Sequence, residues 1–240
     1  MRVSRLYLPE AFQTGDELLL TGERAHYVLS VLRLKPGDPL TVFDGQGGEY
    51  RAELSAANRR QARLKIGSFK VREAESPLRI HLGLAIAKGE RMDWSVQKAT
   101  ELGVCVITPL ITERCTVRLG DKAEHKRAHW QKIAIAACEQ CGRNKIPEIL
   151  LPQALKPWLD TRRGGVLLDP EGVPFPALTQ PGDELTLLLG PEGGLSRAER
   201  QCALASGFVS ASLGPRILRV ETAVVAALSI AQALWGDVRG

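Results

Sequence analysis

Three polar residues follow the most apolar helical run of the chain and are spaced to share one edge of a helix. The run is residues 133–137 (IAIAA), and Glu139, Gln140 and Arg143 come soon after it. Residues four apart lie on one helix face, so Glu139 and Arg143 are expected to project together, with Gln140 on the adjoining row. A carboxylate beside a guanidinium can accept a proton and stabilise negative charge. A surface ion pair explains the same spacing equally well.

Two glycine-proline segments have the residue types of a ligand pocket. Residues 188–196 read LLGPEGGLS and residues 213–223 read LGPRILRVETA, and each follows an apolar, strand-like run. A helix-like segment follows each of them, so two loops are expected at neighbouring strand ends, where they form one pocket. Neither loop has the lysine and serine or threonine of a phosphate-binding loop, and no G-x-G-x-x-G motif follows a strand. Backbone groups beside leucine and isoleucine side chains favour a flat, uncharged heterocycle such as adenine.

A purely structural interpretation of the first loop stays open. Ser196 and Glu199 have the spacing of a helix capping box, so residues 190–196 could form only a strand-to-helix turn, with glycines where a positive φ is needed. The repetition of the pattern at residues 213–223 favours the pocket.

The cysteine and histidine residues do not indicate a metal site. Cys138 and Cys141 have redox-motif spacing, but they lie inside a helix-like run and no second pair completes a zinc site. His125 and His129 are four residues apart without an acidic residue between them, which favours a solvated helix face. Five scattered cysteines indicate thiols in a reducing compartment. No apolar run reaches bilayer-spanning length and no signal peptide is recognised, so the chain is expected in the cytoplasm, away from membranes.

Length and charge allow two domains and a polyanionic partner. The 240 residues carry 32 Lys and Arg against 27 Asp and Glu, a formal net charge of +5. The excess lies in residues 1–72, which have 12 basic and 8 acidic side chains and in which Arg59, Arg60 and Arg63 cluster. This bias is compatible with RNA binding, although most basic clusters are only solvated surface.

The first 72 residues read as a small β-domain. Short strands are expected at residues 18–20, 40–43, 49–54 and 62–69, with a helix at residues 24–31 and turns between them. A small β-barrel with a helix against one side is the simplest arrangement, and such barrels commonly bind RNA. The polar stretch at residues 72–77 marks a linker, which divides the chain into domains 1–72 and 73–240.

Beyond the linker, strands and helices alternate, which predicts an α/β domain with a mainly parallel sheet. Polar residues are expected at the carboxyl ends of the strands, where ligands bind in such sheets. Lys88 and Arg91 follow the first of these strands, and Arg114 follows the second. The expected strands are residues 80–87, 104–111, 149–151, 166–168, 185–189 and 208–213, and the expected helices are residues 92–102, 124–141, 155–159, 197–205 and 221–234.

These segments together resemble the ribosomal RNA small subunit methyltransferase E family. The resemblance runs nearly from end to end and includes both glycine-proline segments. Its other motifs are KGERM at 88–92, QKATELGV at 97–104, ITPL at 107–110, TERC at 112–115 and WQKIAIAACEQCGR at 130–143.

The resemblance implies an enzyme of the SPOUT superfamily that methylates N3 of one uridine in the decoding region of 16S ribosomal RNA. The methyl donor would be S-adenosylmethionine, and its leaving group is a neutral thioether, so no metal is expected. The resemblance also implies a homodimer, a PUA-like N-terminal domain that binds RNA, and a C-terminal trefoil knot that holds the cofactor. The residues expected at the cofactor are Leu168, Leu188, Leu189, Gly190, Glu192, Gly193, Leu213, Gly214, Ile217, Leu218, Glu221 and Ala223.

Uracil N3 carries a proton and lies on the base-pairing edge, so the uridine must be unpaired, and charge that develops on the base must be stabilised. Arg143 and Arg219 are the candidates for that role, and Glu139 is expected to orient Arg143 or accept the proton. RNA contacts are expected from Lys88, Arg91, Arg114, Gln140, Arg59, Arg60 and Arg63. Three other functions stay open at this point: a non-catalytic RNA-binding protein, a tRNA methyltransferase, and a redox protein that uses Cys138 and Cys141.

Overall fold

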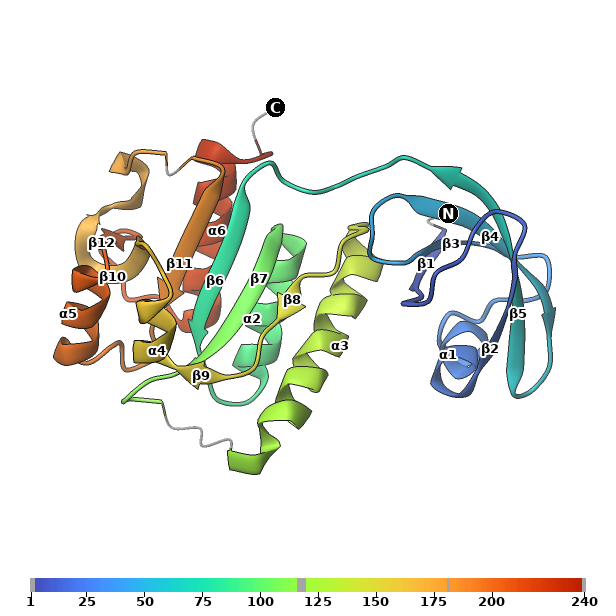
Figure 1. Ribbon diagram of the computed structural model, residues 1–240, viewed down its shortest axis with the longest axis horizontal. Coiled ribbons are helices and arrows are strands. Elements are labelled where there is room, and N and C mark those ends of the chain that lie inside the picture. Colours follow the sequence, from blue (N-terminus) through green and yellow to red (C-terminus); the bar gives the residue numbers. More distant parts are fainter. Residues whose placement is uncertain (1–2, 116–119, 181, 239–240) are drawn as a thin grey trace. The chain divides into compact units, whose positions relative to one another are not determined.

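The computed structural model describes residues 3–115, 120–180 and 182–238, and the chain forms two compact units (Figure 1). The first comprises Met1–Glu75 together with Cys138–Ile146, and the second comprises Ser76–Ala137 together with Pro147–Gly240. The division after Glu75 falls inside the linker predicted at residues 72–77. The segment Cys138–Ile146 joins the first unit, although the sequence pattern places it in the second domain.

A five-stranded sheet with the order β1-β3-β4-β5-β2 forms the first unit. β1 pairs with β3 in parallel, and the other neighbours are antiparallel. The predicted helix is present as α1 (Gly22–His26), which continues into a π-helical turn, η1 (Tyr27–Val31). The strands are β1 (Ser4–Tyr7), β2 (Glu17–Thr21), β3 (Pro39–Phe43), β4 (Glu49–Ala57) and β5 (Gln61–Lys70).

Side chains of this sheet alternate between a core and an exposed face. In β5, Ala62, Leu64 and Ile66 are buried and the residues between them, including Arg63, are exposed. A period of two is that of a strand with one face on a core, because successive side chains point to opposite sides. The alternation therefore fixes Arg63 on the solvent face of the first unit.

A seven-stranded parallel sheet forms the second unit, in the order β12-β10-β11-β6-β7-β8 with β9 also paired to β7. The predicted α/β architecture is confirmed. The strands are β6 (Arg79–Ala85), β7 (Val104–Ile111), β8 (Glu148–Ile149), β9 (Gln153–Ala154), β10 (Gly165–Pro174), β11 (Glu184–Leu189) and β12 (Phe208–Ser212). The helices are α2 (Glu90–Glu101), α3 (Ala123–Cys141), α4 (Leu155–Asp160), α5 (Arg197–Ala205) and α6 (Val220–Trp235), with short 3-10 turns η2 (Gly120–Lys122) and η3 (Phe175–Ala177).

Helices cover both faces of this sheet and form two separate cores. Residues of α2, α3 and α6 pack with Leu185, Leu187 and Leu189 of β11 in the larger core. Residues of α4 and α5 pack with Leu188 of the same strand in the smaller core on the other face. A parallel strand buried on both faces reads as a continuous apolar run, which is why residues 185–189 were recognisable as a strand. None of the helices in the described ranges is long and apolar enough to cross a membrane.

Candidate functional site

A cavity of about 530 Å³ lies in the second unit, where both glycine-proline loops meet. The first loop follows β11 and the second follows β12. Its lining residues are Leu167, Leu168, Asp169, Pro170, Glu171, Leu189, Gly190, Pro191, Glu192, Gly193, Gly194, Leu195, Arg200, Ala211, Leu213, Gly214, Arg216, Ile217, Leu218, Val220 and Ala223. Backbone from two loops, aliphatic side chains and a few charged groups therefore form one concave surface.

The first loop is both a cavity wall and a helix cap. Ser196 is the N-cap of α5, its Oγ accepts a hydrogen bond from the Glu199 amide, and the Glu199 carboxylate accepts one from the Ser196 amide. The amide of Gly194 donates to the Pro191 carbonyl at 2.8 Å, which closes a tight turn with Gly194 at φ +68°. The two interpretations of this segment are thus compatible, since the capping box holds the turn that lines the cavity.

Gly214 opens the second loop in a conformation that favours glycine. Its φ is +99°, and no heavy atom lies within 4 Å of the position that a Cβ would occupy. A side chain at Gly214 would have space but a strained backbone.

The two loops do not follow neighbouring strands, which corrects the expectation from the sequence. β10 lies between β11 and β12 in the sheet. The carboxyl end of β10 therefore supplies a third wall, which includes Asp169 and Glu171. Arg200 of α5 forms ion pairs with both carboxylates.

Sequence reasoning missed this acidic wall because residues 166–168 were taken as the whole strand, whereas β10 extends to Pro174. Polar side chains after the end of the predicted strand were the available signal: the rule that ligands bind at strand carboxyl ends identifies Asp169 in the same way as Lys88.

All of the residues predicted at the cofactor line this cavity except Leu188 and Glu221. Leu188 is fully buried on the opposite face of the sheet, where it packs in the same core as Trp158. The cause is the strand alternation, which turns Leu189 toward one face and Leu188 toward the other. Glu221 lies in the first turn of α6, and its Oε2 is buried without a hydrogen-bond partner among the described residues.

Glu192 of the first loop is held as a carboxylate. Its Oε1 accepts from Arg91 Nη1 at 2.8 Å, and the amide of Lys88 is a further donor. Partial burial acts to raise the pKa of Glu192, but the amide hydrogen bonds and the Arg91 guanidinium outweigh it and hold the pKa below its usual value. Arg114 Nη1 also reaches this loop and donates to the Gly193 carbonyl at 2.7 Å.

Arg143 is buried in the first unit and its guanidinium binds Glu75 in a bidentate pair. Nε donates to Oε1 at 3.1 Å and Nη2 donates to Oε2 at 2.6 Å, and the Arg143 side chain is only 3% exposed. The carboxylate that orients Arg143 is therefore that of Glu75, whereas Glu139 was the partner expected from the helical spacing.

Glu139 accepts hydrogen bonds from the first unit. Its Oε1 accepts from the Tyr7 amide at 2.9 Å and its Oε2 accepts from the Tyr27 hydroxyl at 3.1 Å. Burial raises the pKa of Glu139, and these two hydrogen bonds together with the Arg5 charge offset only part of that rise. Burial and the neighbouring Glu139 carboxylate in turn raise the pKa of Tyr27 to about 12.

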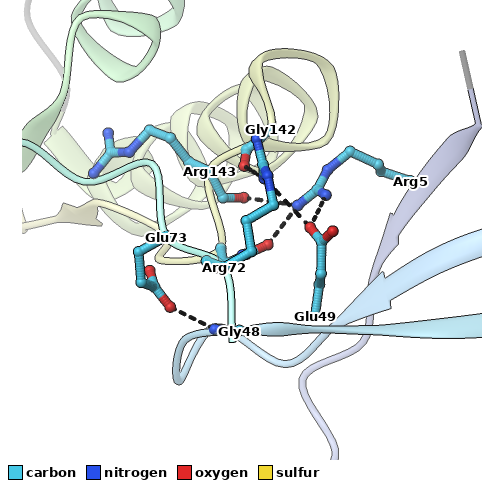
Figure 2. Close-up of polar contacts among 8 residues, drawn as sticks. Arg5, Gly48, Glu49, Arg72, Glu73, Gly142 and Arg143 are labelled. Atoms are coloured by element: carbon cyan, nitrogen blue, oxygen red, sulfur yellow. Dashed lines mark hydrogen bonds and ion pairs between the residues drawn. The ribbon is translucent and has the colours of Figure 1, made fainter. Parts of the chain in front are cut away.

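A network of charged side chains fixes the end of α3 in the first unit (Figure 2). Arg5 pairs with Glu49 and also donates to the carbonyl of Arg143. Arg72 donates to the carbonyl of Gly142 at 2.8 Å and bonds the same Glu49. Carbonyls at a helix C-terminus lack partners within the helix, and arginine donors satisfy two of them here. This network explains why residues 138–146 belong to the first unit.

The other predicted RNA-binding residues lie on exposed surface. Arg59 and Arg60 lie in the turn between β4 and β5, and Arg63 forms an exposed ion pair with Glu17 at 3.2 Å. Gln140 is exposed in the last turn of α3, and Lys88 is exposed after β6. Arg59, Arg60 and Arg63 therefore lie near one another on the first unit, whereas Lys88 belongs to the second.

The contacts of Cys138 are those of an inert thiol. All five cysteines are unbridged. The hydrogen bond with Cys141 and burial raise the pKa of Cys138, which disfavours the thiolate that redox chemistry requires. Among the residues that the structure describes, no group of three or more His, Cys, Asp or Glu side chains could hold a metal ion.

Both units match known RNA methyltransferases. Residues 74–232 match the RNA methyltransferase domain family, and residues 20–67 match the RNA methyltransferase PUA domain. Ribosomal RNA small subunit methyltransferase E of Buchnera aphidicola subsp. Schizaphis graminum is 36% identical over 99% of this chain and 98% of that protein. The chain belongs to the ribosomal RNA small subunit methyltransferase E family. The relative of that name from Bacillus subtilis is 33% identical over 88% of this chain and 87% of its own length.

Solved structures agree with this membership along the whole chain. A Legionella pneumophila protein, solved in complex with the bound cofactor SAM, superposes with a TM-score of 0.95 at 42% identity and covers 99% of this chain and 100% of its own. The ribosomal RNA small subunit methyltransferase E of Neisseria gonorrhoeae, solved bound to S-adenosylmethionine, has a TM-score of 0.93 at 37% identity, with 99% and 100% coverage. The family and fold class predicted from the sequence, including the PUA-like part, are confirmed.

Proposed function

We propose that this protein transfers a methyl group from S-adenosylmethionine to N3 of one uridine in small-subunit ribosomal RNA. The observation that carries the proposal is the cavity of about 530 Å³ in which both glycine-proline loops meet. The two solved relatives described with S-adenosylmethionine bound support the choice of cofactor. The name of the Buchnera and Bacillus relatives supports small-subunit RNA as the substrate.

The residues of the cavity fit S-adenosylmethionine. The volume lies in the range of roughly 300 to 1,000 Å³ that is usual for small-molecule pockets. Leu168, Leu213 and Leu218 offer apolar surface for the adenine ring, and the loop backbones offer donors and acceptors for its edge. Asp169 and Glu171 add acceptors for hydroxyl or ammonium groups of the ligand. The bound cofactor supplies a methyl group activated by its sulfonium charge.

Arg219 is the residue that we assign to stabilising the charge that develops on the uracil. It is exposed and lies between Leu218 and Val220, both of which line the cavity. Its place at the N-cap of α6 gives it a fixed backbone, with its carbonyl bonded to the Ala223 amide at 2.8 Å. We assign Arg143 and Glu139 to holding the end of α3, since both have buried partners in the first unit.

Several parts of the proposal rest on the family resemblance and have no counterpart in a single chain without ligand. They are the homodimer, the trefoil knot around the cofactor, the position of the uridine in the decoding region, and the cytoplasmic assembled subunit as the substrate.

The function is tested by incubating the protein with S-adenosylmethionine and small subunits that lack the modification, followed by mass mapping of the nucleosides. A methyl group on N3 of one uridine is expected. Methyl transfer to tRNA, or none to either RNA, would refute the proposal.

Ala223→Phe is expected to weaken binding of S-adenosylmethionine by on the order of a hundredfold, because a ring at the cavity wall overlaps the space of the ligand. Calorimetry on the purified protein measures the Kd. Ala205→Phe is the matched control, because Ala205 is exposed on α5 and lies outside the cavity lining. Equal affinity of Ala223→Phe and the wild type would place the cofactor elsewhere.

Neutralising Arg59, Arg60 and Arg63 to glutamine is expected to weaken RNA binding and to reduce the slope of log K against log salt by roughly two to three, because each lost phosphate contact releases one fewer counterion. Filter binding at several salt concentrations measures the slope, and calorimetry should find the Kd for S-adenosylmethionine unchanged. An unaltered slope would leave these arginines as ordinary surface.

A further inference from the structure

The first cavity loop, residues 190–194, is fastened to two other loops of the second unit by four polar contacts. Its own sequence, Gly-Pro-Glu-Gly-Gly, gives it little intrinsic rigidity, since glycine has the largest backbone freedom of all residues. A loop of this composition recognises a ligand with its backbone only when other elements hold that backbone in place.

The first fastening joins the loop to the end of β6 and the start of α2. Arg91 Nη1 lies 2.8 Å from Glu192 Oε1, and the Lys88 amide donates to the same carboxylate. The side chains of Arg91 and Glu192 are 45% and 35% exposed, so water screens this pair and its individual contribution is modest.

The second fastening joins the loop to the end of β7. Arg114 Nη1 donates to the Gly193 carbonyl at 2.7 Å, and the Arg114 side chain packs beneath Gly193, where a Cβ would meet Arg114 Cδ at 3.6 Å. A hydrogen bond from a charged donor to a backbone carbonyl is among the stronger kinds. It acts directly on the peptide that lines the cavity.

The last contact anchors the C-terminal end of the same loop. Glu199 Oε1 accepts a hydrogen bond from the Glu113 amide at 2.7 Å, while Oε2 accepts from the Ser196 amide in the capping box. One carboxylate therefore ties the start of α5 to the end of β7. The loop is held on both sides by the segments that follow β6 and β7.

We propose that Arg91 and Arg114 are positioning residues that preorganise the first cavity loop for S-adenosylmethionine. This inference rests on the proposed function, because it assumes that the cavity holds this cofactor. Their residue type and their place after two strands predicted contacts with RNA phosphates. In the structure both guanidinium groups are instead directed to the loop, one to its carboxylate and one to its backbone.

The primary experiment is calorimetry with S-adenosylmethionine on Arg114→Gln, Arg91→Gln and the control Arg197→Gln. Arg197 is an exposed arginine at the start of α5 that lies outside the cavity lining. Loss of a charge-assisted hydrogen bond predicts about tenfold weaker binding for Arg114→Gln. The screened pair predicts about threefold for Arg91→Gln, and no change is expected for the control.

Two conservative changes separate positioning from overall stability. Arg114→Lys keeps one charged donor and should recover part of the affinity that Arg114→Gln loses. The double change Arg91→Glu with Glu192→Arg should bind more tightly than either single change, because it restores the ion pair in reverse. Melting temperatures within the range of the control would show that the variants are folded.

Kinetics and amide exchange complete the test. The KM for S-adenosylmethionine should rise in Arg114→Gln while kcat at saturating cofactor stays unchanged, and the amides of residues 190–194 should exchange faster in the protein without ligand. Normal cofactor affinity together with a shallower salt dependence of RNA binding would overturn the inference and restore the phosphate role. Failure of the proposed function is distinguishable, because the wild type itself would then not bind S-adenosylmethionine.

Discussion

Arg219→Ala is expected to slow single-turnover methyl transfer by on the order of a hundredfold, the loss typical of a donor that stabilises charge in the transition state. The affinity for S-adenosylmethionine should be nearly normal, because Arg219 is absent from the cavity lining while its neighbours Leu218 and Val220 belong to it. Rapid-quench measurement with saturating cofactor and saturating small subunits isolates the chemical step from binding.

Two further variants give this measurement its meaning. Arg219→Lys should recover only part of the rate, because a lysine keeps the charge and loses the planar fork of donors. Arg197→Ala removes an arginine from the start of another helix of the same unit and should transfer methyl at the wild-type rate. A normal rate in Arg219→Ala would exclude this residue from the chemical step and direct attention to Arg216, the cation that lines the cavity on the same loop.

Arg143→Ala is expected to lower the free energy of unfolding by about 3 kcal/mol, because it leaves the partly buried Glu75 carboxylate without its partner. The two groups form a bidentate pair with side-chain exposures of 3% for Arg143 and 17% for Glu75. Urea unfolding followed by circular dichroism measures the loss. Arg63→Ala is the matched control in the same unit, since its pair with Glu17 is 52% exposed on both sides and should contribute less than about 1 kcal/mol.

A double-mutant cycle distinguishes a structural pair from a catalytic arginine. Arg143→Met combined with Glu75→Met should recover much of the lost stability, because an apolar pair replaces a buried ion pair without leaving a charge unpaired. The folded fraction of Arg143→Ala should still transfer methyl when cofactor and RNA are saturating. Wild-type stability combined with a hundredfold slower reaction would instead return Arg143 to the reaction centre.

The helices and strands were largely predictable because their signals are local. Apolar runs flanked by glycine and proline predicted β6, β7, β11 and β12 to within one or two residues at most ends. Polar residues around a helical apolar pattern predicted α2, α3 and α6 equally well. The capping box at Ser196 and Glu199 located the start of α5 because its two hydrogen bonds need only four consecutive residues. β10 was predicted too short because the strand continues through polar residues, including Asp169 and Glu171.

Most of the cavity was also predictable, since its loops follow strand ends and the sequence marks both loops with Gly-Pro. Leu188 was misplaced at the cofactor, because an apolar run that is buried on both faces gives no sign of which residue points to which helix layer. Glu221 was included with its motif, although the cavity is lined on either side of it by Val220 and Ala223.

The sequence by itself therefore determined the order of the elements, the two loops that line the cavity and the family of the chain, because each depends on neighbouring residues. Only the tertiary structure decided that β10 separates β11 from β12 and adds an acidic wall, and that Arg91 and Arg114 hold a loop about a hundred residues away or nearly so. It also decided that Arg143 pairs with Glu75, 68 residues away, and not with Glu139. Spacing along a helix limits which side chains can meet, but a buried charge takes the partner that packing brings within hydrogen-bond distance.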